Sequence, residues 1–295
     1  MGKVYLGEEF FSDVHTHLKK VIVNKTVNIL KKPASRYQVD EEGVVKTIEF
    51  DFTGAFDEIT SIDIYGLYYA FSVCTGITGS VSFPELTTVE SNGLYYAFQG
   101  CTGITGSVSF PKLTSIDTYG LYYAFSDCTG ITSISFPELT TVESSGLILA
   151  FAACTGITSI SFPKLRSVAS SGLRYVFRGC KGITSISFPE LTTIESNGLG
   201  YAFHVCTGIT SISFPKLTSI GNFGLQYAFA ACTGITSISF PELTTVGSRG
   251  FYYAFEGCTG ITELHFRADA QSVIESQNGY STNFGATNAT IYFDL

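Results

Sequence analysis

Apolar and polar residues recur in a fixed order along most of the chain, from about residue 45 to residue 266. In one representative copy, Ile160 and Phe162 alternate with Ser159 and Ser161, three residues after Ile157. This alternation predicts a short strand with one buried side. Each copy also holds one cysteine, and the eight are Cys74, Cys101, Cys128, Cys154, Cys180, Cys206, Cys232 and Cys258. The first two intervals between neighbouring cysteines are one residue longer than the five equal intervals that follow, and such a regular period predicts a solenoid of stacked coils.

The strand is expected to end at Phe162-Pro163, because proline has no N–H to donate and its fixed φ turns the chain. Leu165 and Val168 then form a second extended run. Equivalent first strands are expected to begin at Ile77, Ile104, Ile131, Ile157, Ile183, Ile209, Ile235 and Ile261. The first two carry one extra residue, as in Gly79-Ser80-Val81, which predicts a β-bulge.

A glycine, Gly172 in the representative copy, follows the second run in all eight copies. Its recurrence predicts a turn with φ above zero. Leu173, Val176 and Phe177 are then spaced i, i+3 and i+4, which predicts one turn of α-helix or 3₁₀-helix before the cysteine.

The two ends of the chain depart from the repeat. Residues 1–44 are interpreted as an amino-terminal cap, residues 45–266 as the solenoid and residues 267–295 as a carboxyl-terminal cap, because an open solenoid end exposes apolar side chains and strand edges. In the first cap we expect a strand at 4–6, a helix at 8–20, a strand or hairpin at 21–29 and a break at 33–35.

The first coil is expected to begin with a strand at 45–50 and to continue through an insertion, 51–58, before Ile59 resumes the repeat. In the carboxyl-terminal cap we expect a short helix at 270–277, a loop at 278–288 and a closing strand at 290–293. The interval from Phe266 to Phe293 equals the interval between the first two cysteines, so this cap is interpreted as an altered final coil.

The cysteines occupy the same position of every coil, so we expect them to form a column of buried, free thiols that act as small hydrophobic side chains. Adjacent coils would place them at the strand spacing of about 4.8 Å, which is too wide for the Cβ separation of a disulfide. One cysteine per coil forms a line, whereas zinc needs a tetrahedral set. No cofactor and no metal site are predicted.

The formal net charge is −8. Nucleic-acid binding draws its affinity from clustered cations, so a nucleic acid is not an expected partner.

No apolar run approaches the length of a membrane span. None of the early residues forms the apolar core of a secretory signal, so we expect such a signal to be absent or already removed. Glu and Lys alternate after the prolines, which predicts a ladder of opposite charges on neighbouring coils. We expect a monomer.

The inventory of reactive residues does not favour an enzyme. The four histidines lack Cys or acidic partners at ligand spacing, and no nucleophile elbow, phosphate-binding loop or paired-carboxylate pattern occurs. No catalytic residue is predicted.

Two departures from the repeat are candidate binding sites. The coil from Pro163 to Phe188 holds five cations and no acid: Lys164, Arg166, Arg174, Arg178 and Lys181. It could bind an acidic glycan or an acidic protein patch, or simply balance the glutamates of flanking coils.

The second residue after the turn glycine is a tyrosine in four coils: Tyr68, Tyr95, Tyr122 and Tyr252. Because other residue types replace it elsewhere, this column is expected to be exposed and suited to protein or carbohydrate contacts. The adjacent, nearly uniform tyrosine column is expected to be a half-buried structural ladder.

The pattern YAF-x-x-CTGITSISFP, as in Tyr227 to Pro241, resembles the BspA-like, or Treponema pallidum-type, class of bacterial leucine-rich repeats. The resemblance covers about residues 45–266, although the period is longer than is usual for that class. It implies a β-rich α/β solenoid, a right-handed array of about eight coils with parallel strands and short helical turns, each coil of about 26–27 residues. Members look like surface-exposed or secreted adhesion proteins, with relatives among phage-associated proteins, and the resemblance supplies no catalytic residues.

Two hypotheses follow. The first is a secreted or surface-displayed binding module that contacts a host or matrix protein or glycan. The second is a structural spacer or phage-associated fibre component in which the solenoid only sets distance. An intracellular scaffold is a further alternative, because free thiols persist in a reducing compartment.

Overall fold

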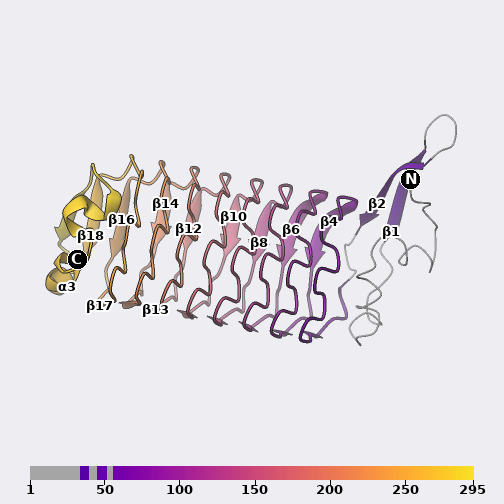
Figure 1. Ribbon diagram of the computed structural model, residues 1–295, viewed down its shortest axis with the longest axis horizontal. Helices are drawn as coiled ribbons and strands as arrows, with labels where there is room; N and C mark the ends of the chain where they lie inside the picture. The colour runs from indigo at the N-terminus through magenta and orange to yellow at the C-terminus, as the bar shows by residue number, and fades with distance from the viewer. Residues whose placement is uncertain (1–33, 40–44, 52–55) are drawn as a thin grey trace.

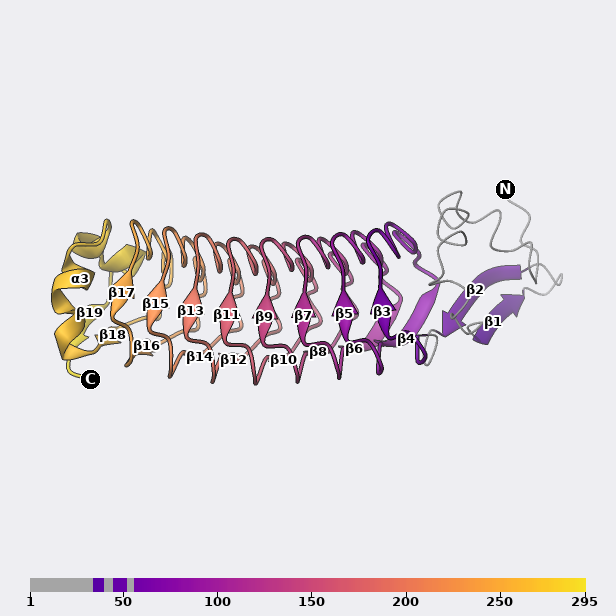
Figure 2. The ribbon, with the colours of Figure 1, turned by 90° about the horizontal axis from the view of Figure 1, so that it is seen from below.

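The protein is an elongated solenoid with two sides made of parallel strands and a third side made of turns (Figures 1 and 2). One strand side holds a single 8-stranded sheet, and the other is divided into sheets of six, two and three strands. The computed structural model describes residues 34–39, 45–51 and 56–295. Within these residues the predicted solenoid of stacked coils with parallel strands is confirmed. The predicted elements at 4–6, 8–20 and 21–29 lie outside the described residues.

The first sheet face carries one strand from every coil (Figure 1). Its strands are β2 (Val45–Asp51), β4 (Ile77–Ser82), β6 (Ile104–Ser109), β8 (Ser133–Ser135), β10 (Ser159–Ser161), β12 (Ser185–Ser187), β14 (Ser211–Ser213), β16 (Ser237–Phe240), β18 (Glu263–Phe266) and β19 (Thr290–Phe293). From β8 to β18 each strand starts two residues later than the sequence predicted. The bulge at Gly79-Ser80-Val81 is confirmed as a register shift between β4 and β6.

The second sheet face consists of eight parallel two-residue strands (Figure 2). They are β3 (Ser61–Ile62), β5 (Thr88–Val89), β7 (Ser115–Ile116), β9 (Thr141–Val142), β11 (Ser167–Val168), β13 (Thr193–Ile194), β15 (Ser219–Ile220) and β17 (Thr245–Val246). They confirm the predicted second extended run, whose Leu165 and Val168 are fully buried.

The third side, called here the turn face, runs from the residue before the turn glycine to the residue before the cysteine, 171–179 in the representative coil. The predicted helical turn is wrong: these residues form hydrogen-bonded turns in every coil. Every second N–H donates to the next coil, as Tyr175 N does to Gly200 O at 2.9 Å. The N–H groups between them donate three residues back, as Val176 N does to Leu173 O at 3.2 Å. The turn face therefore joins coils much as a sheet does.

Left-handed residues explain why no helix forms. In the representative coil φ is 59° at Ser171, 58° at Tyr175 and 78° at Gly179, a positive value at every fourth residue. A right-handed helix requires negative φ throughout, so these residues interrupt it. Leu173, Val176 and Phe177 are buried, as their spacing predicts. A turn that repeats every four residues buries the same three positions as one helical turn does, so the spacing alone does not distinguish the two structures.

The turn glycines do not have the positive φ that their recurrence predicted, since that conformation belongs to the residue before them. A Cβ on Gly172 would lie 3.0 Å from Val168 Cγ1 and 3.1 Å from the Ala169 carbonyl oxygen. On Gly66 it would lie 2.8 Å from Ile62 Cγ2. Glycine is therefore required because the turn packs directly on the aliphatic side chain of the second sheet.

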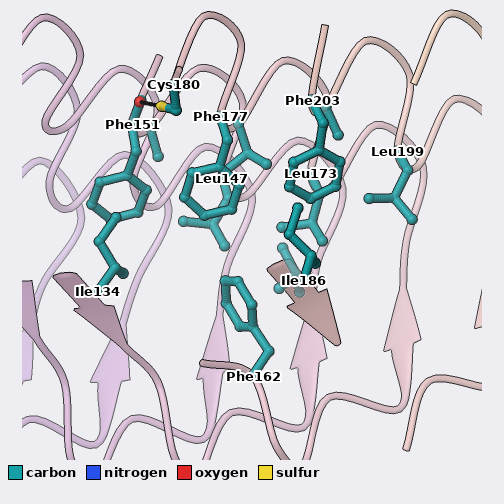
Figure 3. Packing of buried hydrophobic residues seen from close by; sticks show 14 of the residues in the cluster. Ile134, Leu147, Phe151, Phe162, Leu173, Phe177, Cys180, Ile186, Leu199 and Phe203 are labelled. Atoms are coloured by element: carbon teal, nitrogen blue, oxygen red, sulfur yellow. Dashed lines mark hydrogen bonds between the residues drawn. The ribbon is translucent and has the colours of Figure 1, made fainter. Parts of the chain in front are cut away.

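The core is built from columns of identical side chains (Figure 3). The phenylalanine that ends each first strand stacks on its neighbours, with Phe136 and Phe162 centroids 5.3 Å apart. A second column comes from the turn face, where Phe151 and Phe177 are 5.7 Å apart. Stacked aromatic rings at this separation contribute beyond the apolar area that they bury.

The cysteine column is confirmed. The seven cysteines from Cys101 to Cys258 are buried free thiols, and Cys74 at the start of the array is half-buried. Each of the seven donates its S–H to a phenylalanine carbonyl of the preceding coil, as Cys180 Sγ does to Phe151 O (Figure 3). Burial raises the pKa of the Cys180 thiol to about 12.

The first coil has a different register from the one predicted. A strand does span Val45–Asp51, but Phe50 pairs with Ile77, and the ring that stacks on Phe83 is Phe56, at 4.4 Å. The interval from Phe56 to Phe83 equals one full repeat, so Phe56, and not Phe50, occupies the phenylalanine position of the first coil. Residues 52–55 of the predicted insertion lie outside the described residues. β1 (Ala34–Val39) pairs antiparallel with β2, where the sequence had predicted only a break.

The carboxyl end follows the prediction more closely. It contains η2 (Ala268–Ala270), α3 (Gln271–Glu275), η3 (Tyr280–Gly285) and β19, which pairs in parallel with β18 and places Phe293 opposite Phe266. The closing strand and its register are confirmed. The segment predicted as a loop contains the 3₁₀ turns of η3.

The charge ladder is also present. Lysine Nζ atoms lie 2.6 Å from glutamate oxygens of the preceding coil in the pairs Lys112–Glu85, Lys164–Glu138 and Lys216–Glu190. These pairs are exposed, and exposed ion pairs contribute little to stability, so we expect the three pairs to add little to the stability of the array.

Candidate functional site

The turn face of the first three coils carries eight tyrosines, called here the tyrosine face: Tyr65, Tyr68, Tyr69, Tyr95, Tyr96, Tyr119, Tyr122 and Tyr123. Two rows run across the coils. In the first, the ring centroids of Tyr68 and Tyr95 lie 4.9 Å apart and those of Tyr95 and Tyr122 4.7 Å apart.

The second row is packed as tightly, with Tyr69 and Tyr96 at 4.7 Å and Tyr96 and Tyr123 at 4.6 Å. Interplanar angles of 3° and 6° make the second row nearly parallel. Each ring of the two rows is therefore held in place by its neighbours.

The backbone of the turn face dictates this arrangement. In the second coil the apolar residues Leu94, Ala97 and Phe98 are fully buried, which leaves Tyr95 and Tyr96 on the outer side. Tyr96 N donates to Tyr122 O at 2.8 Å, so the main chains that carry the rings are tied together across coils.

The rings combine exposure with order. Tyr65 is 53% exposed, Tyr68 38% and Tyr119 39%, while the remaining five are half-buried by their stacking. Burial, reinforced by neighbouring phenols, raises the pKa of Tyr95 to about 12. The Tyr95 phenol therefore keeps its proton, and its capacity to donate a hydrogen bond, at physiological pH.

The sequence-predicted exposed column divides into two places. Tyr68, Tyr95 and Tyr122 belong to the tyrosine face, whereas Tyr252 lies near the far end and is half-buried. There the guanidinium carbon of Arg249 lies 5.6 Å from the ring centroids of both Tyr252 and Phe223. The adjacent column is the half-buried ladder that was expected, broken at Leu149.

Tyr65 and Tyr119 were missed by sequence reasoning. Each precedes a turn glycine and contacts the first row edge-on, Tyr65 against Tyr68 at 5.3 Å and Tyr119 against Tyr122 at 5.5 Å. A signal was available, because the residue before the glycine is aromatic in these coils and polar in most others.

The structure does not bring the five cations of the basic coil together. Lys164 follows β10 and pairs with Glu138, and Arg166 directly precedes β11. Lys181 follows Cys180, between the turn face and β12. Only Arg174 and Arg178 share the turn face.

Arg174 and Arg178 are held differently. The Arg174 guanidinium carbon lies 4.9 Å from the Tyr175 ring centroid, and its Nη2 donates to the Tyr175 hydroxyl at 3.4 Å. Arg178 is exposed and, in the described part of the chain, forms no ion pair. It borders a shallow hollow of about 430 Å³ beside Leu149.

Among the described residues no group of three His, Cys, Asp or Glu side chains is placed to hold a metal ion. The described helices are all too short or too polar to cross a membrane. The turn face presents aromatic rings, phenol hydroxyls and the guanidinium groups of Arg174, Arg178 and Arg249.

The family model for the BspA type leucine rich repeat region matches residues 54–171 and 149–285 in six copies. These ranges cover more than half of the chain, which therefore belongs to the BspA-type leucine-rich repeat family. No curated protein matches the chain.

Solved structures that are similar to the chain include three leucine-rich repeat proteins. A leucine-rich repeat protein from Bacteroides ovatus is 18% identical, with 89% of this chain and 81% of that one covered and a TM-score of 0.39. The T. pallidum leucine rich repeat protein is 13% identical, with 88% and 96% covered and a TM-score of 0.34. A leucine rich cell surface protein from Faecalibacterium prausnitzii is 14% identical, with 88% and 94% covered and a TM-score of 0.27.

Proposed function

We propose that the chain is a non-enzymatic binding module of a bacterial surface or secreted protein, and that its tyrosine face contacts a host or matrix protein or glycan. The observation that carries this proposal is the double row of stacked tyrosines on three consecutive coils, with Tyr65, Tyr68 and Tyr119 the most exposed. Tyrosine offers a flat apolar ring and a polar hydroxyl in one side chain, which suits both protein and carbohydrate surfaces.

The order of the rings supports a binding role. A side chain that is immobilised on binding costs free energy, and rings already stacked at about 4.7 Å have less freedom left to lose. The hydrogen bonds between coils, such as Tyr96 N to Tyr122 O, add a rigid backbone beneath them. The surface is thus arranged for contact before a ligand arrives.

Family membership supports the location. The chain belongs to the BspA-type class. Members of that class resemble surface-exposed or secreted adhesion proteins.

The experiment that tests the function is a binding screen of the full chain. We would immobilise a panel of extracellular-matrix proteins and a glycan array, and measure retention of the fluorescently labelled protein at physiological salt. The proposal expects saturable binding to at least one protein or glycan. A chain that only sets distance would show no saturable binding to any member of the panel, and that result would overturn the proposal.

A further inference from the structure

The tyrosine ladder of the turn face has one gap, and the gap lies beside the two arginines. Tyr123 ends one stack and Tyr175 begins the next, with centroids 4.6 Å from Tyr96 and 4.8 Å from Tyr201 respectively. Leu149 occupies the position between them. The ring face of Tyr123 that points away from Tyr96 is therefore not covered by another ring.

The gap opens into a pair of adjoining hollows that share Tyr123, Leu149 and Arg178. One has a volume of about 430 Å³ and includes Ser126, Asp127 and Ala152 in its lining. The other has a volume of about 360 Å³, and Tyr175, Tyr201 and His204 complete its lining. Pockets of a few hundred Å³ are of the size that holds one small ligand or one residue of a longer one.

The polar groups around the hollows are of two kinds. At one end the Ser126 hydroxyl donates to Asp127 Oδ2 at 2.9 Å, which leaves Asp127 Oδ1 as an acceptor for further donors. Towards the other end stand Arg178, without an ion-pair partner among the described residues, and His204. The Nδ1 atom of His204 is buried without a hydrogen-bond partner in the described structure.

Buried polar atoms without partners are uncommon in proteins, because desolvation is not offset by a hydrogen bond. Desolvation, with the positive charge of Arg178 as the second cause, lowers the pKa of His204. His204 is therefore neutral at physiological pH and adds no charge of its own. Among the residues that line this end of the hollow, Arg178 carries the positive charge.

We propose that this hollow, centred on Arg178, Tyr123 and Asp127, binds a carboxylate-bearing sugar unit of a glycan. Arg178 binds the carboxylate, the part of the Tyr123 ring that lines the hollow packs on the apolar face of the pyranose, and Asp127 accepts hydrogen bonds from the sugar hydroxyls. This inference rests on the proposed binding function and names a second site, which adjoins the tyrosine face and shares Tyr123 with it.

The three contacts are complementary to one ligand class. Guanidinium groups match carboxylates in charge and in planar geometry. A neutral sugar would leave Arg178 without a charged partner, and a simple carboxylate would leave Tyr123 and Asp127 unused. A peptide carboxylate lacks the several hydroxyl donors that the Asp127 end can accept.

The test uses the full chain and defined oligosaccharides in isothermal titration. Hyaluronan oligosaccharides supply a hexuronate, sialyllactose supplies a sialic acid, and lactose is the neutral control. We expect binding to one or both acidic sugars at least tenfold tighter than to lactose, and the two acidic arms distinguish the source of the carboxylate. No binding to either acidic sugar, or equal binding of lactose, overturns the proposal.

Two variants locate the binding within the hollow. Arg178→Gln should weaken acidic-sugar binding about tenfold or more, because a charged hydrogen bond is lost. Leu149→Tyr should abolish it by filling the gap with a residue that the same column accepts in the other seven coils. Lys112→Gln makes the same charge change away from the turn face and should bind normally. Normal binding by Arg178→Gln with melting unchanged would overturn the assignment.

Failure here can be separated from failure of the proposed function. If the hollow binds no acidic sugar, the wild-type chain should still bind its ligand in the panel screen through the tyrosine face. If the chain binds nothing in that screen but takes up acidic sugars lost in Arg178→Gln, the tyrosine face is the part that is wrong.

Discussion

The thiol of Cys180 donates a hydrogen bond to the carbonyl oxygen of Phe151, 3.1 Å away across the boundary between two coils. The same oxygen also accepts the backbone N–H of Cys154 at 3.3 Å. Equivalent bonds occur at every coil from Cys101 to Cys258. The cysteine is therefore a donor that joins coils, in addition to the small hydrophobic side chain that its column position predicted.

This bond predicts an unusual order of stability at position 180. Cys180→Ser keeps a donor for the Phe151 oxygen, whereas Cys180→Ala removes both the donor and buried volume and should lower the free energy of unfolding by about 1–2 kcal/mol. We expect the serine variant to unfold at higher urea concentration than the alanine variant. If alanine is as stable as serine or more so, the thiol acts only as an apolar filler.

Alkaline pH should destabilise the array. Burial raises the pKa of the thiols to about 12 at Cys128, Cys180 and Cys258, against about 8.5 for an exposed cysteine. Above pH 8.5 the unfolded chain releases thiol protons that the folded chain retains, so stability falls as pH rises through this window, by up to about 1.4 kcal/mol per pH unit for each thiol. Urea midpoints should be flat from pH 7 to 8 and drop steeply from 9 to 11. A constant midpoint to pH 10.5 would contradict the buried column.

The left-handed positions of the turn face predict a reciprocal pair of variants. Val73 is 64% exposed with φ of 60°, and Gly100 occupies the same position of the next coil with φ of 71°. A β-branched residue in this conformation is strained, so Val73→Gly should raise stability by about 0.5–1 kcal/mol.

Gly100→Val should lower stability by about 1 kcal/mol or more through the same strain. Its added Cβ would lie 3.7 Å or more from neighbouring atoms, so a clash at that atom cannot account for the loss. Thermal unfolding of both variants, with Val73→Ala as a control of intermediate effect, is the measurement. A Gly100→Val protein as stable as the wild type would contradict the left-handed turn face.

The period made the solenoid predictable, because each strand, each Phe-Pro stop and each buried cysteine repeats at the same position. The turn face was not predictable in the same way. Leu173, Val176 and Phe177 bury the same side whether they lie on a helical turn or on turns that repeat every four residues, and only the hydrogen bonds of Tyr175 and its neighbours separate the two. The register of β2 failed for a related reason, since Phe50 and Phe56 both fit the phenylalanine position and only stacking on Phe83 decides between them.

The candidate site was predictable in part. A variable tyrosine column pointed to Tyr68, Tyr95 and Tyr122, which do lie in one row. The charge of the basic coil does not form one patch, because Lys164 and Arg166 lie between β10 and β11 whereas Arg178 lies on the turn face. Leu149 can be identified as a gap between two tyrosine stacks only from the structure, which shows Tyr123 stacked on Tyr96 and Tyr175 stacked on Tyr201.

The most direct test of the tyrosine face is a comparison of dissociation constants for the tightest ligand found in the panel screen. The triple variant Tyr68→Ser/Tyr95→Ser/Tyr122→Ser removes one row, and Ser185→Ala/Ser211→Ala/Ser237→Ala alters exposed positions on the first sheet face to a matched extent in number. The melting temperature of both variants is measured as a check on folding. We predict at least a tenfold loss of affinity when the three tyrosines are replaced, and less than a twofold change when the three serines of the first sheet face are replaced. Unchanged affinity after replacement of the three tyrosines, or a loss of affinity only after replacement of Ser185, Ser211 and Ser237, would contradict the assignment of binding to the turn face.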